Sequence, residues 1–451
     1  MTTFDEILTA TVGVLNAHRD ALEQIDWLVV NRDLNGRARF IAPEPVERQE
    51  EPRRQVERIY RELAERIAPH AYPPESGLLF EVSREAACSG ATGFRLEDFT
   101  NVWLIDRLAT EGNWAEIAPE TQGPRRIVFF SIKGGVGRST ALAACAWRLA
   151  QAGKRVLVLD LDLESPGLSS SLLPPERQPK YGITDWLVED LVENADTVFE
   201  SMIATSDLAY DGEIYVAPAH GADPGEYVAK LGRVWMPKIQ ADGTRQSWSS
   251  RLHRLLQALE GRIRPDVVLI DSRAGIDEVA SACVTDLGAN LVLLFTLEGC
   301  QTWNGYRILF EHWRRAGVAR QIRERLKSVA ALVPEVDRID YLKGLREGAY
   351  QVFADSLYDE IAPPPPDSIE RKKEGEREMW RVWEIVEGWN FDEADEGAPH
   401  SPWVVHWHRS FAGLRSLQGR LAVIDAAEVN AIFGGLIEGV RGLLDSEINH
   451  D

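Results

Sequence analysis

Residues Arg126–Thr140 read RIVFFSIKGGVGRST, and this stretch decides the fold of the chain. Its apolar start, Ile127–Phe130, predicts a buried strand. The loop that follows, Lys133–Gly137, contains three glycines, whose backbone angles let successive N–H groups point at phosphate oxygens. The next segment, Ala141–Gln151, is rich in alanine and leucine and predicts a helix whose positive N-terminal end faces the same anion. The order strand, glycine-rich loop, helix favours a phosphate-binding site over a flexible turn.

Two later strands end in carboxylates. Arg155–Asp162 reads RVLVLDLD, an apolar run typical of a parallel strand that is buried on both faces. Because side chains alternate along a strand, its last two carboxylates, Asp160 and Asp162, are expected on one face. Pro265–Gly275 is a second apolar strand with Asp271 at its carboxyl end. Metal and phosphate sites lie at the carboxyl ends of strands in parallel sheets, so we expect all three aspartates in one site.

Alternating strands and helices define the fold class. Further strands are predicted at Glu213–Ala217, Leu291–Thr296 and Ser328–Val333, with helices between them. This order implies right-handed crossovers and a mostly parallel, doubly wound α/β sheet with helices on both faces. The predicted parts of the chain are an N-terminal α+β accessory region (1–122), this α/β domain (123–340) and a mainly helical, tryptophan-rich C-terminal extension (341–451).

The glycine-rich loop resembles the deviant Walker A box, K-G-G-x-x-K-[ST], of the ParA/MinD family of P-loop ATPases. Two positions differ from the known patterns. Ile132 stands where the ordinary Walker A box has glycine, and Arg138 stands where a lysine is usual. The two strands that end in aspartate resemble the D-x-D box and the Walker B segment of the same family. The resemblance covers about Arg125 to Asp337 and implies ATP and Mg2+ as cofactors.

The resemblance also implies roles for single residues. Lys133 matches the signature lysine, which reaches the phosphates of the facing subunit in a dimer formed on ATP. Asp162 matches the aspartate that positions the attacking water, and Asp271 matches the aspartate that holds magnesium through water. The implied sets are a catalytic set of Lys133, Arg138 and Asp162, a magnesium set of Ser139, Asp160 and Asp271, and a phosphate-binding set of Lys133, Gly134, Gly135, Val136, Gly137, Arg138, Ser139 and Thr140.

Three functions are compatible with these motifs. The leading interpretation is a slowly hydrolysing ATPase that forms a homodimer around ATP and recruits or regulates a partner protein. Arg138 keeps the charge of lysine but presents a planar fork, so the alternative is a nucleotide-binding module with little or no turnover. A third interpretation is a recruitment subunit of a multi-protein system such as antiphage defence or plasmid maintenance. The base preference stays open, since Pro334 stands where many relatives have an asparagine that reads adenine.

Composition limits the partners and the compartment. The 451 residues include 50 basic and 71 acidic side chains, a net charge of −21, which argues against nucleic-acid binding through the general field of the protein. The four cysteines form no C-x-x-C pair, so we expect neither a zinc site nor a disulfide framework, and we expect a cytoplasmic protein. No apolar run approaches the ~20 residues that span a bilayer, and we expect no membrane contact.

One segment, His312–Lys327, is locally basic. Weak, nonspecific DNA contact is one interpretation of this segment, and a solvated helix face is the other. Its cations are Arg314, Arg315, Arg320, Arg323, Arg325 and Lys327.

The C-terminal region combines aromatic, proline-rich and helical segments. Five tryptophans lie between Trp380 and Trp407, and they indicate either packing onto the ATPase domain or a partner-binding surface. Ala362–Pro366 and Arg371–Glu378 predict a linker or surface insertion. The last predicted helix, Ala426–Leu444, has apolar residues at helical spacing but lacks a basic polar face. We therefore expect it to pack against the protein and not against a membrane.

Overall fold

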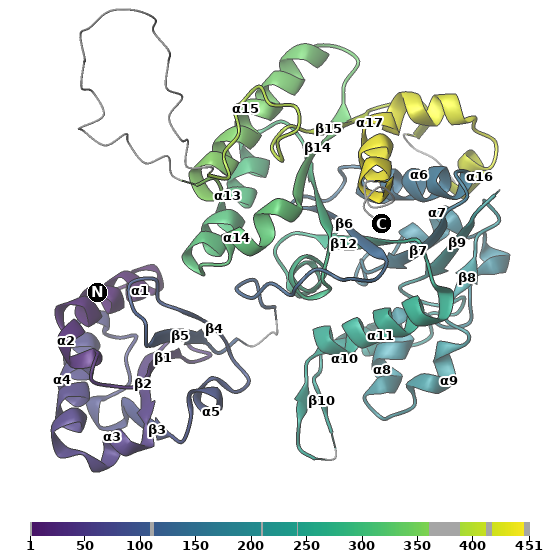
Figure 1. Ribbon diagram of the computed structural model, residues 1–451. Coiled ribbons are helices and arrows are strands. Elements are labelled where there is room, and N and C mark those ends of the chain that lie inside the picture. The colour runs from purple at the N-terminus through teal and green to yellow at the C-terminus, as the bar shows by residue number, and fades with distance from the viewer. Residues whose placement is uncertain are drawn as a thin grey trace, which may run out of the picture.

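The computed structural model describes residues 2–108, 112–208, 211–240, 242–359, 388–411 and 417–445. These residues form an N-terminal α+β domain and a larger α/β domain (Figure 1). The predicted insertion, with Ala362–Pro366 and Arg371–Glu378, lies outside the described residues, as do Trp380 and Trp383.

The N-terminal domain is built on a mixed five-stranded sheet in the order β3-β2-β1-β5-β4. Helices α1 and α4 cover one face, where the rings of Phe40 and Tyr60 meet edge to face at 5.3 Å. The short helix α5 covers the other face, against Val29 and Ile105. The elements are α1 (Phe4–Ala17), α2 (Arg19–Leu22), β1 (Leu28–Arg32), β2 (Ala38–Pro43), α3 (Glu44–Arg48), α4 (Glu50–Ile67), β3 (Leu78–Glu81), α5 (Arg84–Cys88), β4 (Thr92–Arg95) and β5 (Val102–Asp106).

The α/β domain is built on an eight-stranded sheet in the order β15-β14-β13-β6-β12-β7-β9-β8. Every neighbouring pair is parallel except β8 with β9, which confirms the predicted fold class. The strands are β6 (Arg125–Ser131), β7 (Arg155–Asp160), β8 (Ala204–Thr205), β9 (Glu213–Ala217), β12 (Val267–Ala274), β13 (Leu291–Thr296), β14 (Leu326–Val333) and β15 (Trp403–His406).

Helices cover both faces of this sheet (Figure 1). Side chains alternate along β6, so that Ile127 and Phe129 pack under α6 and α17. Val128 and Phe130 pack on the opposite face, against α8, α11, α13 and α15. The helices are α6 (Arg138–Gln151), α7 (Leu168–Leu172), α8 (Ile183–Asp190), α9 (Ala195–Phe199), α10 (Tyr227–Val234), α11 (Trp248–Ile263), α12 (Glu278–Ser281), α13 (Cys300–Arg315), α14 (Ala319–Ile322), α15 (Arg338–Ser356), α16 (Leu417–Leu421) and α17 (Ala426–Asp445), and the hairpin strands β10 (Lys238–Ile239) and β11 (Arg245–Gln246) lie between α10 and α11.

The sheet continues beyond residue 340, the predicted end of the α/β domain. β15 pairs in parallel with β14, and α17 packs on β15 and α6. The predicted packing of the last helix is confirmed, because its apolar face is buried in the same core cluster as α6. The strand β15 was not predicted in this mainly helical extension. Among the described residues, no helix combines the length and apolar character that crossing a membrane requires.

The basic segment does not form one exposed cationic face. The interpretation as a DNA-contacting segment is wrong for Arg323, Arg325 and Lys327, because their side chains are buried and form hydrogen bonds within the fold. The other three cations of the segment are exposed. The internal partners are the Asp359 carboxylate for Arg323 (2.9 and 3.1 Å), the Ala118 carbonyl for Arg325 (2.8 Å) and the Ala398 carbonyl for Lys327 (2.7 Å).

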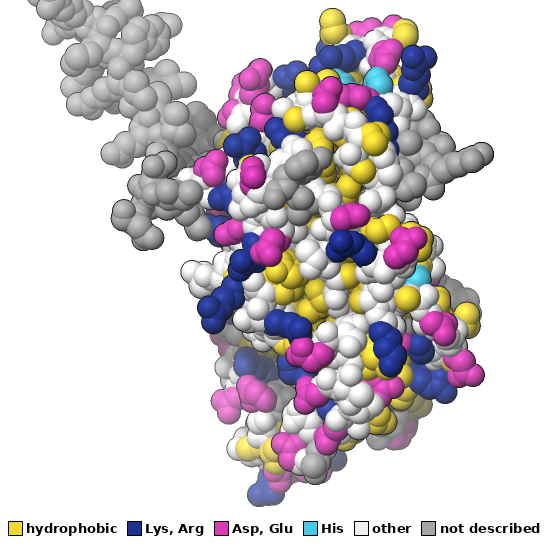
Figure 2. All heavy atoms as spheres, turned by 90° about the vertical axis from the view of Figure 1, so that its right-hand side faces the viewer, with side chains coloured by type: hydrophobic (Ala, Val, Ile, Leu, Met, Phe, Trp, Pro, Cys, Tyr) yellow, Lys and Arg dark blue, Asp and Glu magenta, His cyan; other side chains and the backbone are white. Residues whose placement is uncertain are grey.

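On the face shown in Figure 2, cationic and anionic side chains are interspersed, with hydrophobic side chains between them. The net charge of −21 is therefore not gathered into one acidic surface on this face.

Helix α17 approaches β15 closely at Gly439. A Cβ atom there would lie 2.3 Å from the Trp403 ring. Gly439→Ala should therefore lower the free energy of unfolding by about 1–3 kcal/mol, although alanine favours helix more than glycine does. Gly442→Ala in the same helix is the control, because a Cβ there meets nothing within 4 Å. It should raise the free energy of unfolding by up to about 1 kcal/mol. Urea unfolding measures both, and equal effects would contradict this packing.

Candidate functional site

The glycine-rich loop forms an open cradle at the carboxyl end of β6. Gly135 and Gly137 have φ values of 75° and 77°, in the left-handed region that favours glycine. A Cβ atom at Gly134 or Gly135 would meet nothing within 4 Å. Helix α6 begins at Arg138, earlier than the predicted Ala141, so the N–H groups of its first turn border this space. The loop and the helix end together present N–H donors to an anion.

The three predicted aspartates do lie on one face of the sheet. In β7, Val156 and Val158 pack in the core under α6, and Asp160 continues the same alternation. Asp271 ends the apolar part of β12 on the same side and is 1% exposed. Asp162 follows β7 and is partly buried. The structure thus brings the three carboxylates together, and their role in binding a nucleotide or metal stays a prediction.

Arg138 is directed toward the carboxylates. Its side chain is 7% exposed, and its Nε atom donates to Asp271 Oδ1 at 2.6 Å. Its two terminal nitrogens donate to Ser131 Oγ at 3.0 Å and to Asp162 Oδ2 at 3.5 Å. The sequence placed Arg138 in the phosphate-binding and catalytic sets, and both roles stay predictions. What the structure shows is a buried guanidinium that links Asp271 to Asp162.

Ser139 and Lys133, at the two ends of the loop, have different partners. Ser139 Oγ donates to Asp271 Oδ2 at 2.5 Å, so the two residues predicted to hold magnesium are in direct contact. The Lys133 side chain is exposed and donates to the Gln301 side chain near the start of α13. The ammonium therefore lies at the rim of the loop, accessible from the outside.

Burial affects the acidity of the aspartates. It raises the pKa of Asp160 to about 7, and the neighbouring Asp271 charge adds to this effect, while bonds from Ser169 oppose it. Burial also raises the pKa of Asp162, against the attraction of the Arg138 charge. Three carboxylates are thus crowded into a space of low dielectric with one cation between them.

Several residues of the site were not predicted. Ser169 donates to Asp160 Oδ2 through its N–H at 3.2 Å and its hydroxyl at 3.1 Å. Arg273 bridges Glu164 at 2.5 Å and Asp277 at 3.3 Å, which joins the segment after Asp271 to the segment after Asp162. The sequence offered one usable signal, the charge of Arg273 two residues after Asp271. Ser169 had none, because its role depends on how α7 folds back.

The residues present fit a magnesium nucleotide. Of the described residues, none donates a hydrogen bond to Asp160 Oδ1 or Asp162 Oδ1, although both atoms are buried. Carboxylate and hydroxyl oxygens are the ligands that Mg2+ prefers. The open space over Gly134 and Gly135 would admit a phosphate chain beside them.

Comparison with known protein families also points to a nucleotide-binding domain. The profile described as "CobQ/CobB/MinD/ParA nucleotide binding domain" (CbiA) matches residues 127–426, more than half of the chain. The chain belongs to this family. The CobQ/CobB/MinD/ParA match confirms the predicted ParA/MinD relationship, and it extends past residue 340 to include β15.

Individual relatives of this CobQ/CobB/MinD/ParA chain are distant. The "Putative arsenical pump-driving ATPase 1" of Aquifex aeolicus (strain VF5) is 45% identical over 53 residues, and this match spans 12% of the chain but only 13% of that relative. The MinD structure with Mg-ADP from Pyrococcus horikoshii OT3 is 21% identical with a TM-score of 0.33, covering 48% of this chain and 72% of that one. Cobyrinic acid a,c-diamide synthase from Mycobacterium smegmatis, with an ATP analogue and magnesium, is 21% identical with a TM-score of 0.36, covering 53% and 86%.

A pocket of about 330 Å³ lies at the same edge of the sheet as the glycine-rich loop. Leu332, in β14, approaches the loop so closely that a Cβ at Gly137 would lie 3.1 Å from it. The pocket begins two residues later, at Pro334. Its lining comes from the segments after β14 and β15 and from α17, and comprises Pro334, Glu335, Arg338, His406, Trp407, His408, Glu428, Ala431 and Ile432.

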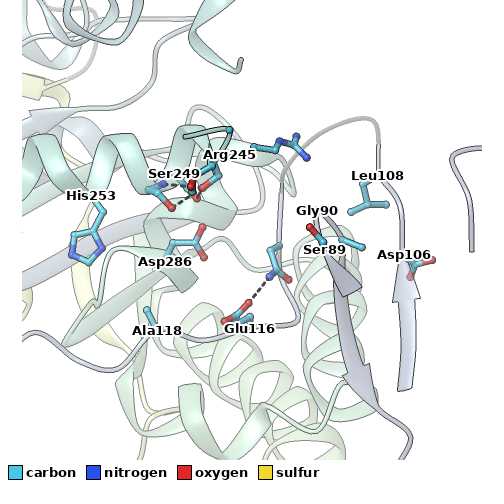
Figure 3. A pocket seen from close by; sticks show the side chains of 16 residues that line it. Ser89, Gly90, Asp106, Leu108, Glu116, Ala118, Arg245, Ser249, His253 and Asp286 are labelled. Atoms are coloured by element: carbon cyan, nitrogen blue, oxygen red, sulfur yellow. Dashed lines mark hydrogen bonds between the residues drawn. The ribbon is translucent and has the colours of Figure 1, made fainter. Parts of the chain in front are cut away.

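A larger pocket, of about 710 Å³, lies between the N-terminal domain and the α/β domain (Figure 3). Its wall includes the polar side chains of Asp106 from β5, His253 from α11 and Asp286. None of its lining residues belongs to the glycine-rich loop or to the three aspartates. It is therefore separate from the candidate nucleotide site.

Proposed function

We propose that this chain is an ATP-dependent switch. It binds ATP with Mg2+, hydrolyses it slowly, and forms a dimer around the nucleotide that recruits or regulates a partner protein. The observation that best supports this proposal is the meeting of the P-loop with Asp160, Asp162 and Asp271 on the α6 face of the sheet. Phosphoryl transfer is catalysed mainly by positioning and charge, and this constellation provides both.

Each part of the site has a role in this proposal. The N–H groups of Gly134–Thr140 would bind the phosphate chain at the positive end of α6. Ser139 and Asp271 would hold magnesium, with Asp160 behind them. Bound Mg–ATP supplies a polarised γ-phosphoryl group. Asp162, with one buried oxygen that lacks a hydrogen-bond donor among the described residues, would orient the attacking water.

Binding and turnover should separate in two variants. Asp162→Ala should keep its affinity for Mg–ATP and lose phosphate release, because it removes the group that orients water and leaves the loop, Ser139 and Asp271 in place. Ser139→Ala should weaken Mg–ATP binding by at least about tenfold, because it removes a magnesium ligand. Calorimetry measures binding, and a phosphate-release assay measures turnover. Unchanged Mg–ATP affinity in Ser139→Ala would remove this residue from the magnesium set.

The position of Lys133 is an argument for the proposed dimerisation on ATP. Its ammonium is exposed at the rim of the loop, and its contact within the described residues is with Gln301, a surface neighbour. A cation there can neutralise the phosphates of a facing subunit, which would link dimerisation to nucleotide binding.

Lys133→Ala should bind ATP with an affinity close to that of the wild type but stay monomeric. Solution mass with ADP, ATP and a slowly hydrolysed analogue measures this. Lys343→Ala, which removes another exposed lysine, is the control and should dimerise normally. A wild type whose mass is the same in every nucleotide state would rule out the dimer.

The 330 Å³ pocket is the proposed base site. Trp407 is 43% exposed and offers a stacking face, and Glu335 can accept a hydrogen bond from an amino group such as that of adenine. Stacking on an aromatic side chain contributes about 1–3 kcal/mol per base.

Trp407→Ala should therefore weaken ATP binding by about tenfold and leave the binding of magnesium tripolyphosphate unchanged. Competition of both ligands against a fluorescent ATP analogue measures the two affinities. Trp389→Ala is the control, since Trp389 lies outside this pocket. Equal weakening of ATP and tripolyphosphate in Trp407→Ala would place the base elsewhere.

The second candidate function is a nucleotide-binding module without turnover. The pairing of Arg138 with Asp271 and Asp162 favours it, because this guanidinium is turned toward the two carboxylates that metal binding and water positioning would use. In that case the chain would act as a recruitment subunit of a multi-protein system in the cytoplasm, with the N-terminal domain carrying the specificity. A wild type that releases no phosphate under any partner condition, yet binds ATP, decides for this function.

A further inference from the structure

We infer that Arg138 is the resident counter-cation of the aspartate cluster, and that it determines how strongly this site depends on magnesium. This inference rests on the proposed nucleotide site. It goes beyond that site because it assigns a new role to Arg138: this residue neutralises the negative charge of the aspartates that a divalent ion would otherwise neutralise alone.

The first observation is that Asp271 already has hydrogen-bond donors at both carboxylate oxygens. One of its oxygens accepts from Arg138 Nε at 2.6 Å and the other accepts from Ser139 Oγ at 2.5 Å. Both oxygens of this 1% exposed carboxylate are therefore engaged by the protein itself. A magnesium ion that draws on Asp271 has to displace or rearrange these contacts.

The second observation is that the positive charge of arginine is permanent. A buried carboxylate is costly unless a cation or hydrogen-bond donors accompany it. The guanidinium does not lose its proton in proteins, so its compensation is permanent. Its planar fork also reaches Asp271, Ser131 and Asp162 at the same time. The single ammonium of a lysine cannot reproduce these three directions.

The consequence is a competition between two cations for one cluster. While the guanidinium stays on Asp271 and Asp162, free Mg2+ gains little by binding there. A phosphate chain in the loop offers Arg138 another anion, which releases the carboxylates for the metal. Magnesium should therefore bind appreciably only together with the nucleotide.

The test uses the full chain without nucleotide. We expect the melting temperature of the wild type to change by less than about 1 °C between EDTA and millimolar Mg2+. Arg138→Gln should melt lower in EDTA, because the crowded carboxylates lose their counter-charge, and Mg2+ should raise its melting temperature by about 3 °C or more. Arg273→Gln is the matched control: it removes an arginine that pairs with Glu164 and Asp277 instead, and it should show no gain from Mg2+.

Two results would overturn the inference: a wild type that gains as much from Mg2+ as Arg138→Gln does, or an Arg138→Gln variant that Mg2+ does not stabilise. Arg138→Lys covers the case in which glutamine prevents folding. Because Mg2+ is expected to bind the wild type appreciably only with the nucleotide, Mg2+ must in turn raise the ATP affinity of the wild type by at least about tenfold over EDTA. It should raise that of Arg138→Lys by a smaller factor, and equal factors would also overturn the inference. A wild type that binds no ATP in either buffer refutes the proposed function, whereas the melting experiment still decides the role of Arg138.

Discussion

Negative charge buried on one face of the sheet is the constraint on which the site depends. Parallel strands alternate their side chains, and the apolar members of this face pack under α6 and α17. Asp160 and Asp271 continue the same alternation where the strands end, so their carboxylates have little access to water. A cation, hydroxyl groups and the positive end of α6 have to compensate them. Arg138 and Ser139 are the first two residues of that helix, and both bond to Asp271.

This arrangement ties the loop to the core. Leu332 of β14 approaches Gly137, and Ile132 fits against Gly305 of α13, where a Cβ would lie 2.4 Å from it. Ile132 stands where the ordinary Walker A box has glycine, and the absence of a side chain at Gly305 makes room for it. The departure from the pattern is therefore matched by a second glycine that is 173 positions away in the sequence.

The C-terminal segment is part of the same construction. β15 extends the sheet beyond β14, and α17 lies over it and over α6, with Arg148 donating to Asn430 at 3.0 Å. The end of β15 then borders the 330 Å³ pocket that we propose as the base site. A segment of unrelated appearance in the sequence thus supplies a wall near the proposed nucleotide site. The N-terminal domain, in contrast, has its own sheet and core, and none of its described residues belongs to the site.

The sequence by itself determined the parallel sheet, the P-loop and the positions of Asp160, Asp162 and Asp271, because strand alternation and glycine-rich turns are local features. It also indicated that the last helix packs on the protein, through its apolar spacing and lack of a basic face. It did not determine the direction of the Arg138 side chain, the burial of Arg323, Arg325 and Lys327, or the strand β15. These depend on which partners the fold brings close. From the sequence alone, a cation on a helix is expected to face solvent, and only the tertiary structure shows that a carboxylate or a carbonyl oxygen lies beside it. A four-residue edge strand forms only where a neighbouring strand offers hydrogen bonds.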